Sequence, residues 1–129
     1  RQMCIRDRFM VEENEIQQIR DAIANSPFVN DYEFVQSSPW YYELLPKNAS
    51  KGEGLMHLAD LMNVDRSNTI GIGDNENDLA LVKMANVGVA VSNAVDEVKE
   101  VADFITVDNN SSAVAAVIYA LDDEEIKFE

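Results

Sequence analysis

Residues 71–78 contain the side chains best suited to bind a metal ion and phosphate. They read Gly-Ile-Gly-Asp-Asn-Glu-Asn-Asp and begin within an apolar stretch, residues 69–73, that predicts a buried strand. Asp74 follows this strand, where ligands bind in open parallel sheets, and its carboxylate offers the hard oxygen atoms that Mg²⁺ prefers. A helix predicted from Asn77 presents its N-terminus to an anion. Alternatively, Asp74, Asn77 and Asp78 only cap this helix, and both interpretations stay open.

A calcium-binding EF-hand loop is a third interpretation of the same segment. Asp74, Glu76 and Asp78 occupy alternate positions, as at the start of such a loop. The loop also needs a glycine at its sharp turn and a glutamate at its end, and Leu79 and Ala85 occupy these positions. The sequence therefore excludes an EF-hand.

Lys51 is a second candidate for phosphate binding. It belongs to the sequence Ser50-Lys51-Gly52 at the start of a predicted helix. A lysine offers a compact positive charge to phosphate oxygens, but it is unfavourable near a helix N-terminus. This placement favours a functional role, and the alternative is a solvated surface lysine. His57 lies off the apolar stripe of the same helix and is predicted to be on the surface.

Apolar periodicity predicts an α/β fold. From about residue 50 onward, strands and helices alternate as in βαβ units, which favours a Rossmann-like parallel sheet with flanking helices. The residues before this point indicate antiparallel α+β structure. The predicted helices cover about residues 12–24, 51–63, 77–85, 95–102 and 113–121, and the predicted strands cover residues 32–35, 40–45, 69–73, 87–91 and 104–107.

Individual positions refine these elements. An apolar stripe is predicted to be the buried face of the helix that follows Ser50; it comprises Leu55, Leu58, Ala59 and Met62. Asn93 and either Ser111 or Ser112 are predicted to cap the helices that follow them.

The composition excludes some partners. The formal net charge is -14, with 24 acidic and 10 basic residues, so neither nucleic acid nor an anionic membrane is an expected partner. No apolar run approaches the ~20 residues that a bilayer requires. The single cysteine, Cys4, allows no internal disulfide and fits a reducing compartment. We therefore expect a cytoplasmic protein.

Residues 50–52 and residues 73–78 form two candidate motifs. Their combination at this spacing is far more specific than either motif alone. Residues 37–121 resemble the Cof-like branch of the haloacid dehalogenase superfamily. The resemblance includes the lead-in over residues 41–47, both motifs, and the later segments 88–91, 93–94 and 103–105. It covers about two thirds of the chain.

The resemblance implies a role for each candidate residue. Asp74 would bind Mg²⁺, Lys51 would hold the transferring phosphoryl group, and Asn77 would hydrogen-bond phosphate. Asp78 would orient Lys51 or a metal-bound water molecule. Asn93 is expected to be structural.

The resemblance also implies a domain organisation. Residues 1–8 are expected to be a truncated or artefactual start, residues 9–46 the remnant of an α+β cap domain that covers the substrate, and residues 47–129 the C-terminal half of an incomplete haloacid dehalogenase core. Trp40 and Tyr42 could stack on a substrate, but core packing or sheet pairing is the favoured role for both.

One departure from the family pattern bears on activity. Enzymes of the family attack phosphate with the first aspartate of an Asp-x-Asp motif, which occurs nowhere in these 129 residues. Without this nucleophile we expect these residues alone to be inactive. The expected function is that of a Mg²⁺-dependent phosphohydrolase of small phosphorylated metabolites, such as sugar phosphates or phosphorylated cofactors, acting through an aspartyl-phosphate. The alternative is a non-catalytic phosphate- or metal-binding module. Neither substrate identity nor oligomeric state follows from the sequence.

The first prediction concerns stability. If a central parallel strand is missing from these residues, apolar strand edges are exposed, and the 129-residue chain should be poorly stable or prone to aggregate. Thermal unfolding followed by circular dichroism tests this prediction. A cooperative transition of a monomer well above ordinary temperatures would contradict it.

Overall fold

The computed structural model describes residues 7–126 and divides the chain into two compact units. The first unit extends to Ser50, and the second begins at Lys51. Each unit has its own three-stranded sheet.

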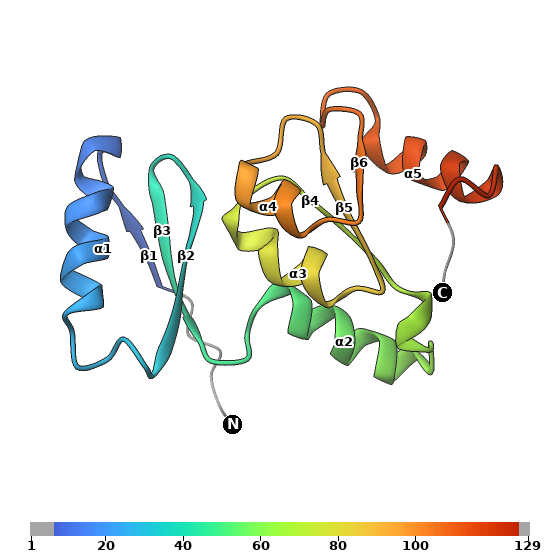
Figure 1. The fold of residues 1–129 in the computed structure, drawn as a ribbon. Coiled ribbons are helices and arrows are strands. Elements are labelled where there is room, and N and C mark those ends of the chain that lie inside the picture. Colours follow the sequence, from blue (N-terminus) through green and yellow to red (C-terminus); the bar gives the residue numbers. More distant parts are fainter. Residues whose placement is uncertain (1–6, 127–129) are drawn as a thin grey trace. The chain divides into compact units, whose positions relative to one another are not determined.

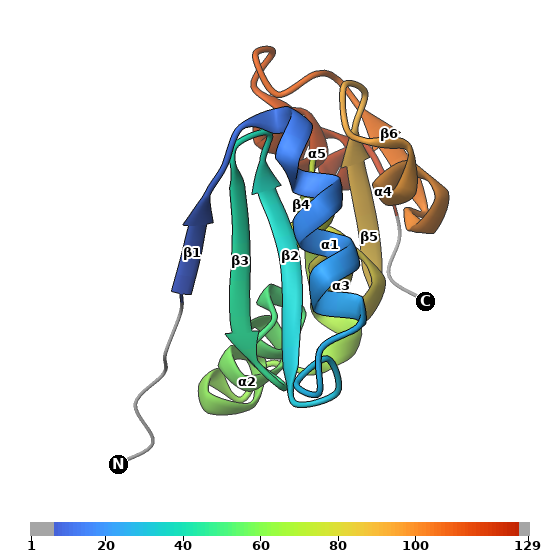
Figure 2. The same ribbon diagram turned by 90° about the vertical axis from the view of Figure 1, so that its left-hand side faces the viewer.

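The first unit is an antiparallel sheet with the strand order β1-β3-β2 and one helix against a face of the sheet (Figure 1; Figure 2). Its elements are β1 (Asp7–Met10), a 3₁₀ turn (Glu13–Glu15), α1 (Ile16–Ala24), β2 (Tyr32–Ser38) and β3 (Tyr41–Pro46). The antiparallel α+β character predicted for this part of the chain is confirmed.

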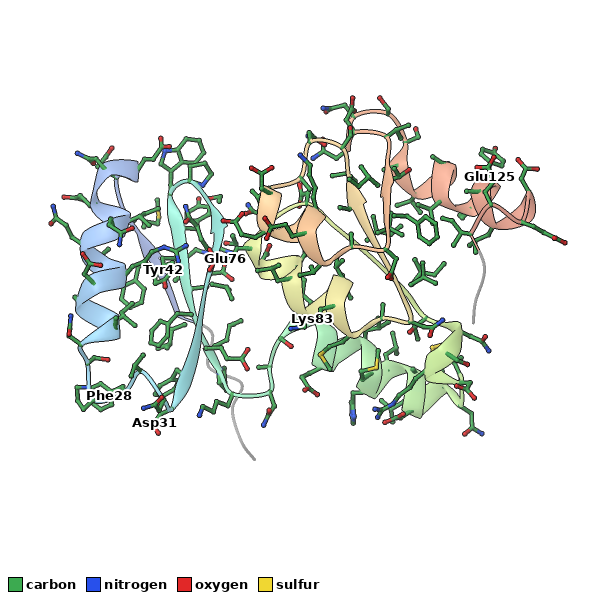
Figure 3. The ribbon with its side chains drawn as sticks, in the orientation of Figure 1. Phe28, Asp31, Tyr42, Glu76, Lys83 and Glu125 are labelled. Atoms are coloured by element: carbon green, nitrogen blue, oxygen red, sulfur yellow. The ribbon has the colours of Figure 1, made fainter. Side chains whose placement is uncertain are left out.

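Helix α1 packs on the sheet through its predicted apolar stripe. Ile16 is buried, and Ile19 and Ile23 are half-buried. The guanidinium of Arg20 lies 5.1 Å from the centre of the Tyr42 ring, which adds a cation–π contact between helix and sheet. Figure 3 shows Tyr42 on the side of the sheet that carries α1. The core role predicted for Tyr42 is therefore confirmed.

Two features of this unit differ from the sequence predictions. No element was predicted before Glu12, yet Asp7 and the next three residues form β1, which pairs with β3. Trp40 lies in the turn between β2 and β3 with 57% of its surface exposed, so the core packing favoured for Trp40 was wrong. Its carbonyl oxygen accepts from the Val11 N–H at 3.1 Å, next to the paired strands β1 and β3. The truncated or artefactual start was predicted at residues 1–8; residues 1–6 lie outside the described residues, and residues 7 and 8 belong to β1.

The second unit is a parallel sheet with the strand order β4-β5-β6 and helices on both faces (Figure 1). This arrangement confirms the predicted Rossmann-like α/β fold. Its elements are α2 (Lys51–Met62), a 3₁₀ turn (Arg66–Asn68), β4 (Ile70–Gly73), a 3₁₀ turn (Glu76–Asp78), α3 (Leu79–Met84), β5 (Val87–Val91), α4 (Asp96–Val101), β6 (Phe104–Thr106) and α5 (Ala113–Asp122).

Strand β5 forms the centre of this unit. All of its residues are buried, as expected for a parallel strand covered on both faces. On one face Ala90 packs with Val82 and Val98, from α3 and α4. On the other face Val89 packs with Val117 from α5. Between residues 7 and 126, no helix combines the length and the apolar character that crossing a membrane requires.

The buried face of α2 agrees only in part with the predicted stripe. Ala59 is buried and Leu55 is half-buried, as predicted. Leu58 and Met62 are 52% and 64% exposed, and Gly52 and Met56 are buried in their place. At the start of α2, Gly52 faces α3 and allows the two backbones to approach closely. A Cβ atom on Gly52 would lie only 2.3 Å from the carbonyl oxygen of Ala80. Close backbone packing, rather than the largest apolar residues, decides this face.

One of the two predicted helix caps was wrong, and the other holds in position only. Val95, not Asn93, occupies the N-cap position of α4. Ser112 does occupy the N-cap position of α5, but its side chain makes no capping hydrogen bond and its backbone is left-handed, with φ 57°. Ser111 donates its hydroxyl to the carboxylate of Asp108 instead.

The contrast between the two glycines of α2 gives the second prediction. Gly52→Ala should destabilise the protein by about 1–3 kcal/mol, because the added methyl group collides with the α3 backbone. Gly54→Ala is the matched control: its Cβ atom would meet nothing within 4 Å, so the higher helix propensity of alanine should stabilise the protein by about 0.5–1 kcal/mol. Urea unfolding measures both effects. Equal midpoints for the two variants would contradict the close approach of α2 and α3.

Candidate metal and phosphate site

The site is built where β4 ends and the chain enters α3. The strand finishes at Gly73, and Asp78 lies in the 3₁₀ turn before the helix. A Cβ atom on Gly73 would lie 2.4 Å from the Cβ atom of Asp78. Because Gly73 has no side chain, the turn can fold back on the strand and bring the Asp78 carboxylate beside the strand end.

Asp78 connects Lys51 to the backbone that follows β4. The residue is only 6% exposed. Its Oδ1 accepts a hydrogen bond from Lys51 Nζ, and its Oδ2 accepts from the backbone N–H groups of Asp74 and Asn75 at 3.1 and 3.3 Å. The charged side chain of Lys51 is thereby held against the loop that carries Asp74.

These contacts determine the charge state of Asp78. Burial raises the pKa of its carboxyl group, but the hydrogen bonds from Lys51 and from the Asp74 N–H outweigh burial and hold the pKa below its ordinary value of 3.8. Asp78 is therefore a carboxylate at neutral pH, and the Lys51–Asp78 contact is an ion pair.

Asp74 presents its side chain differently. Its backbone is held on both sides, since the N–H donates to Asp78 and the carbonyl oxygen accepts from the Val95 N–H at 3.0 Å. Its carboxylate is exposed, and Oδ2 accepts a hydrogen bond from Asn109 Nδ2 at 3.1 Å. A carboxylate held in this way can still bind a cation.

The two interpretations of this segment can now be separated. Asn75 is the N-cap of the 3₁₀ turn and forms a capping box with Asp78. Asp78 therefore does cap the turn, while its other oxygen holds Lys51. The Asp74 carboxylate accepts from Asn109 and makes no capping contact. Capping therefore accounts for the position of the Asp78 carboxylate but not for that of the Asp74 carboxylate.

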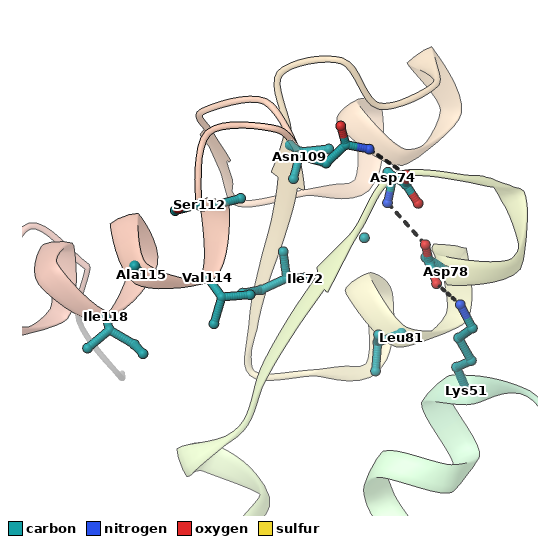
Figure 4. A pocket seen from close by; sticks show the side chains of 13 residues that line it. Lys51, Ile72, Asp74, Asp78, Leu81, Asn109, Ser112, Val114, Ala115 and Ile118 are labelled. Atoms are coloured by element: carbon teal, nitrogen blue, oxygen red, sulfur yellow. Dashed lines mark hydrogen bonds and ion pairs between the residues drawn. The ribbon is translucent and has the colours of Figure 1, made fainter.

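The residues of this hydrogen-bonded chain line one pocket of about 770 Å³ (Figure 4). Lys51, Asp74, Asp78 and Asn109 form its polar wall. The apolar part of the lining includes Ile72, Leu81, Val91, Val114 and Ile118. The pocket thus combines a positive charge suited to an anion with an exposed carboxylate suited to a cation.

Sequence reasoning identified part of this set. Lys51, Asp74 and Asp78 line the pocket, whereas Asn77 is not among its lining residues, and His57 is on the surface as predicted. Asn109 was missed. The signal was available, because Asn109 follows a predicted parallel strand just as Asp74 does, and ligands gather at this edge of a sheet.

The donor set of the pocket fits part of a Mg²⁺ site. Within the described range 7–126, no cluster of three or more His, Cys, Asp or Glu side chains could hold a metal ion. Mg²⁺ is commonly held by one or two protein carboxylates, with water and substrate phosphate completing the octahedron. In such a site Asp74 would supply one carboxylate and the Lys51 ammonium group could contact a phosphate, while the other ligands would be supplied by other groups.

A parallel α/β sheet with an anion- and cation-binding pocket at the carboxyl ends of its strands is shared by several classes of protein. The family model of the haloacid dehalogenase-like hydrolases matches residues 2–118. The chain therefore belongs to the haloacid dehalogenase-like hydrolase family, which confirms the resemblance found in the sequence.

Individual relatives agree with this assignment. The putative phosphatase YxeH of Bacillus subtilis is 43% identical over 90 residues, which are 70% of this chain and 33% of YxeH. The 5-amino-6-(5-phospho-D-ribitylamino)uracil phosphatase YwtE of the same organism is 38% identical over 76 residues, 59% of this chain and 27% of YwtE. A solved haloacid dehalogenase-like hydrolase from B. subtilis, 29% identical, superposes with a TM-score of 0.77 over 88% of this chain and 39% of its own. The chain spans about a third of the length of these curated relatives.

The third prediction follows from the lowered pKa of Asp78. Its ionised form is favoured in the folded state, so its contribution to stability is present above pH 3.8 and is lost as the pH falls through the lowered folded-state pKa. Asp78→Asn should cost about 1–3 kcal/mol at pH 7 because a charge-assisted hydrogen bond is lost. This cost should shrink in strong acid.

Urea unfolding of both proteins at pH 7 and at pH 3 or below measures the difference. Asp96→Asn removes one charge from a carboxylate that is 93% exposed and is the matched control. If the two proteins differed by the same free energy at every pH, the ion pair would not explain the stability.

Proposed function

We propose that this chain supplies the metal- and phosphate-binding half of the active site of a Mg²⁺-dependent phosphohydrolase. The observation that carries the proposal is the hydrogen-bonded chain Lys51–Asp78–Asp74 along the wall of one pocket. It brings a cation and an exposed carboxylate to the same edge of the sheet. Membership in the hydrolase family supports the same reaction class.

Lys51 is assigned to the transferring phosphoryl group. An ammonium group has three N–H donors, and Asp78 accepts one of them. The Lys51 side chain is 51% exposed, so other donors can face the pocket. Asp78 is the orienting residue, because it fixes the ammonium group at one end and the Asp74 loop at the other. Positive charge held in advance stabilises the charge that develops on phosphoryl oxygens.

Asp74 is assigned to the metal. When bound, Mg²⁺ would neutralise charge on the phosphoryl oxygens and help to align the substrate. The chain's own contribution is to hold the Asp74 carboxylate at the pocket wall on a backbone that is fixed by hydrogen bonds to Asp78 and Val95.

The substrate class is small phosphorylated metabolites, such as sugar phosphates or phosphorylated cofactors. The name of YwtE, which describes a phosphorylated ribitylaminouracil, supports this class. We assign residues 47–129 to the catalytic core and residues 9–46 to a cap that covers the substrate. Asn77 is assigned to phosphate on the family resemblance alone.

A non-catalytic phosphate- or metal-binding module is the second candidate, and the missing nucleophile favours it. No Asp-x-Asp sequence occurs among the 129 residues, and covalent transfer through an aspartyl-phosphate requires that aspartate. The enzyme assignment therefore places the nucleophile in residues outside this sequence.

The fourth prediction tests the assigned roles. In a chain extended upstream to the length of its relatives, p-nitrophenyl phosphate should be hydrolysed when Mg²⁺ is present. Asp74→Ala and Lys51→Ala should each lower kcat/KM by about 10²–10³-fold, because each removes preorganised charge stabilisation. Asp96→Ala is the matched control for Asp74→Ala, and Lys83→Ala is the matched control for Lys51→Ala. Both change an exposed residue and should retain activity within about twofold.

One outcome would contradict the enzyme assignment, and another would contradict the residue roles. An extended chain that binds Mg²⁺ and inorganic phosphate but hydrolyses nothing would favour the binding module. Full activity in Asp74→Ala or Lys51→Ala would reject the roles given to these residues.

A further inference from the structure

Two asparagine side chains link the loops that leave the three parallel strands. Asn109 Nδ2 donates to Asp74 Oδ2 at 3.1 Å, and Asn93 Nδ2 donates to Asn109 Oδ1 at 2.9 Å. Asp74 follows β4, Asn93 follows β5 and Asn109 follows β6. Figure 4 shows the amide of Asn109 directed at the Asp74 carboxylate. The side chains therefore form a continuous polar connection across the edge of the sheet.

A backbone group fixes the direction of every hydrogen bond in this connection. The N–H of Asn109 donates to Asn93 Oδ1 at 3.1 Å, and a backbone N–H can only donate. Asn93 must therefore turn its oxygen to this group and use Nδ2 for the Asn109 side chain. Asn109 in turn receives that bond on Oδ1, which leaves its Nδ2 for Asp74. The amide orientations follow from the network itself.

The loop that carries Asn109 is anchored on both sides. Asp108 Oδ1 accepts from the Asn110 N–H at 2.8 Å and from the Ser111 hydroxyl at 3.0 Å. The Ser92 N–H donates to the Val107 carbonyl oxygen at 3.3 Å, which joins this loop to the one after β5. These hydrogen bonds hold the backbone on both sides of Asn109.

The Asp74 side chain needs a hydrogen-bond partner to hold its carboxylate in one orientation. Its backbone is held, but its carboxylate is exposed, so packing does not select one rotamer. A hydrogen bond to Oδ2 selects one orientation. A neutral amide does so without a positive charge that would repel a cation at the same carboxylate.

We propose that Asn109 is a positioning residue that orients Asp74 for the divalent cation, and that Asn93 acts through Asn109 by fixing its amide. The inference rests on the proposed function, because it assumes that Asp74 binds Mg²⁺. Neither asparagine contacts the ion. The loop after β6 thereby becomes part of the metal site.

Calorimetric titration of Mg²⁺ alone into the extended chain tests the proposal. Asn109→Ala should weaken Mg²⁺ binding by about 10–100-fold, the usual effect of removing a partner that orients a metal ligand. Asn93→Ala should weaken binding by a smaller factor. The double variant should bind no more weakly than Asn109→Ala, because Asn93 acts only through Asn109. Asn110→Ala, a neighbouring change in the same loop, is the matched control.

Thermal unfolding in metal-free buffer shows whether each variant is folded. If Asn109→Ala fails to fold, Asn93→Ala carries the test, because it leaves the Asn109 side chain in place. If the losses of Mg²⁺ binding free energy in the two single variants simply added up in the double variant, the proposed action of Asn93 through Asn109 would be overturned.

The test also separates this inference from the proposed function. If the asparagine variants bind Mg²⁺ as the parent chain does and Asp74→Ala does not bind it, the positioning role is wrong and the proposed function stands. If the parent chain does not bind Mg²⁺, or if Asp74→Ala binds it normally, the metal role of Asp74 and the positioning role both fail.

Discussion

The arrangement of the pocket depends on one buried carboxylate whose two oxygens have different partners. Asp78 Oδ1 accepts a hydrogen bond from the ammonium group of Lys51, and Oδ2 accepts from the N–H groups of Asp74 and Asn75. A charge that is 6% exposed requires such partners, because removing a carboxylate from water is costly. The partners come from the start of α2 and the end of β4. The need to satisfy one buried charge therefore brings the Lys51 ammonium group and the loop that carries Asp74 together.

Close backbone packing makes this contact possible. Gly73 leaves room for the Asp78 side chain beside β4, and Gly52 lets the first turn of α2 approach α3 at Ala80. Lys51 precedes Gly52 directly, so the approach that Gly52 allows also brings the lysine within reach of Asp78. The Ser50-Lys51-Gly52 motif thus combines a charge with the space that the charge needs.

The sequence predicted the features that follow from local patterns. The alternation of strands and helices, the continuous burial of β5 and the α1 stripe through Ile16 required only periodicity. The buried face of α2 and the contribution of Asn109 depend on which backbones approach closely and on which loops meet at the sheet edge. A one-dimensional pattern does not contain these distances. Leu58 was predicted to be buried because it is large and apolar, but the helix contact selected the small residue Gly52.

The connection between Asn93 and Asn109 has a consequence for the length of the loop that follows β6. Surface loops usually tolerate inserted and deleted residues. Here the N–H and the side chain of Asn109 must both meet Asn93, so adding or removing one residue between Thr106 and Asn109 would turn the amide away from Asp74. Between these positions the length of the loop is constrained, and so is Asp108, because its carboxylate accepts hydrogen bonds from Asn110 and Ser111.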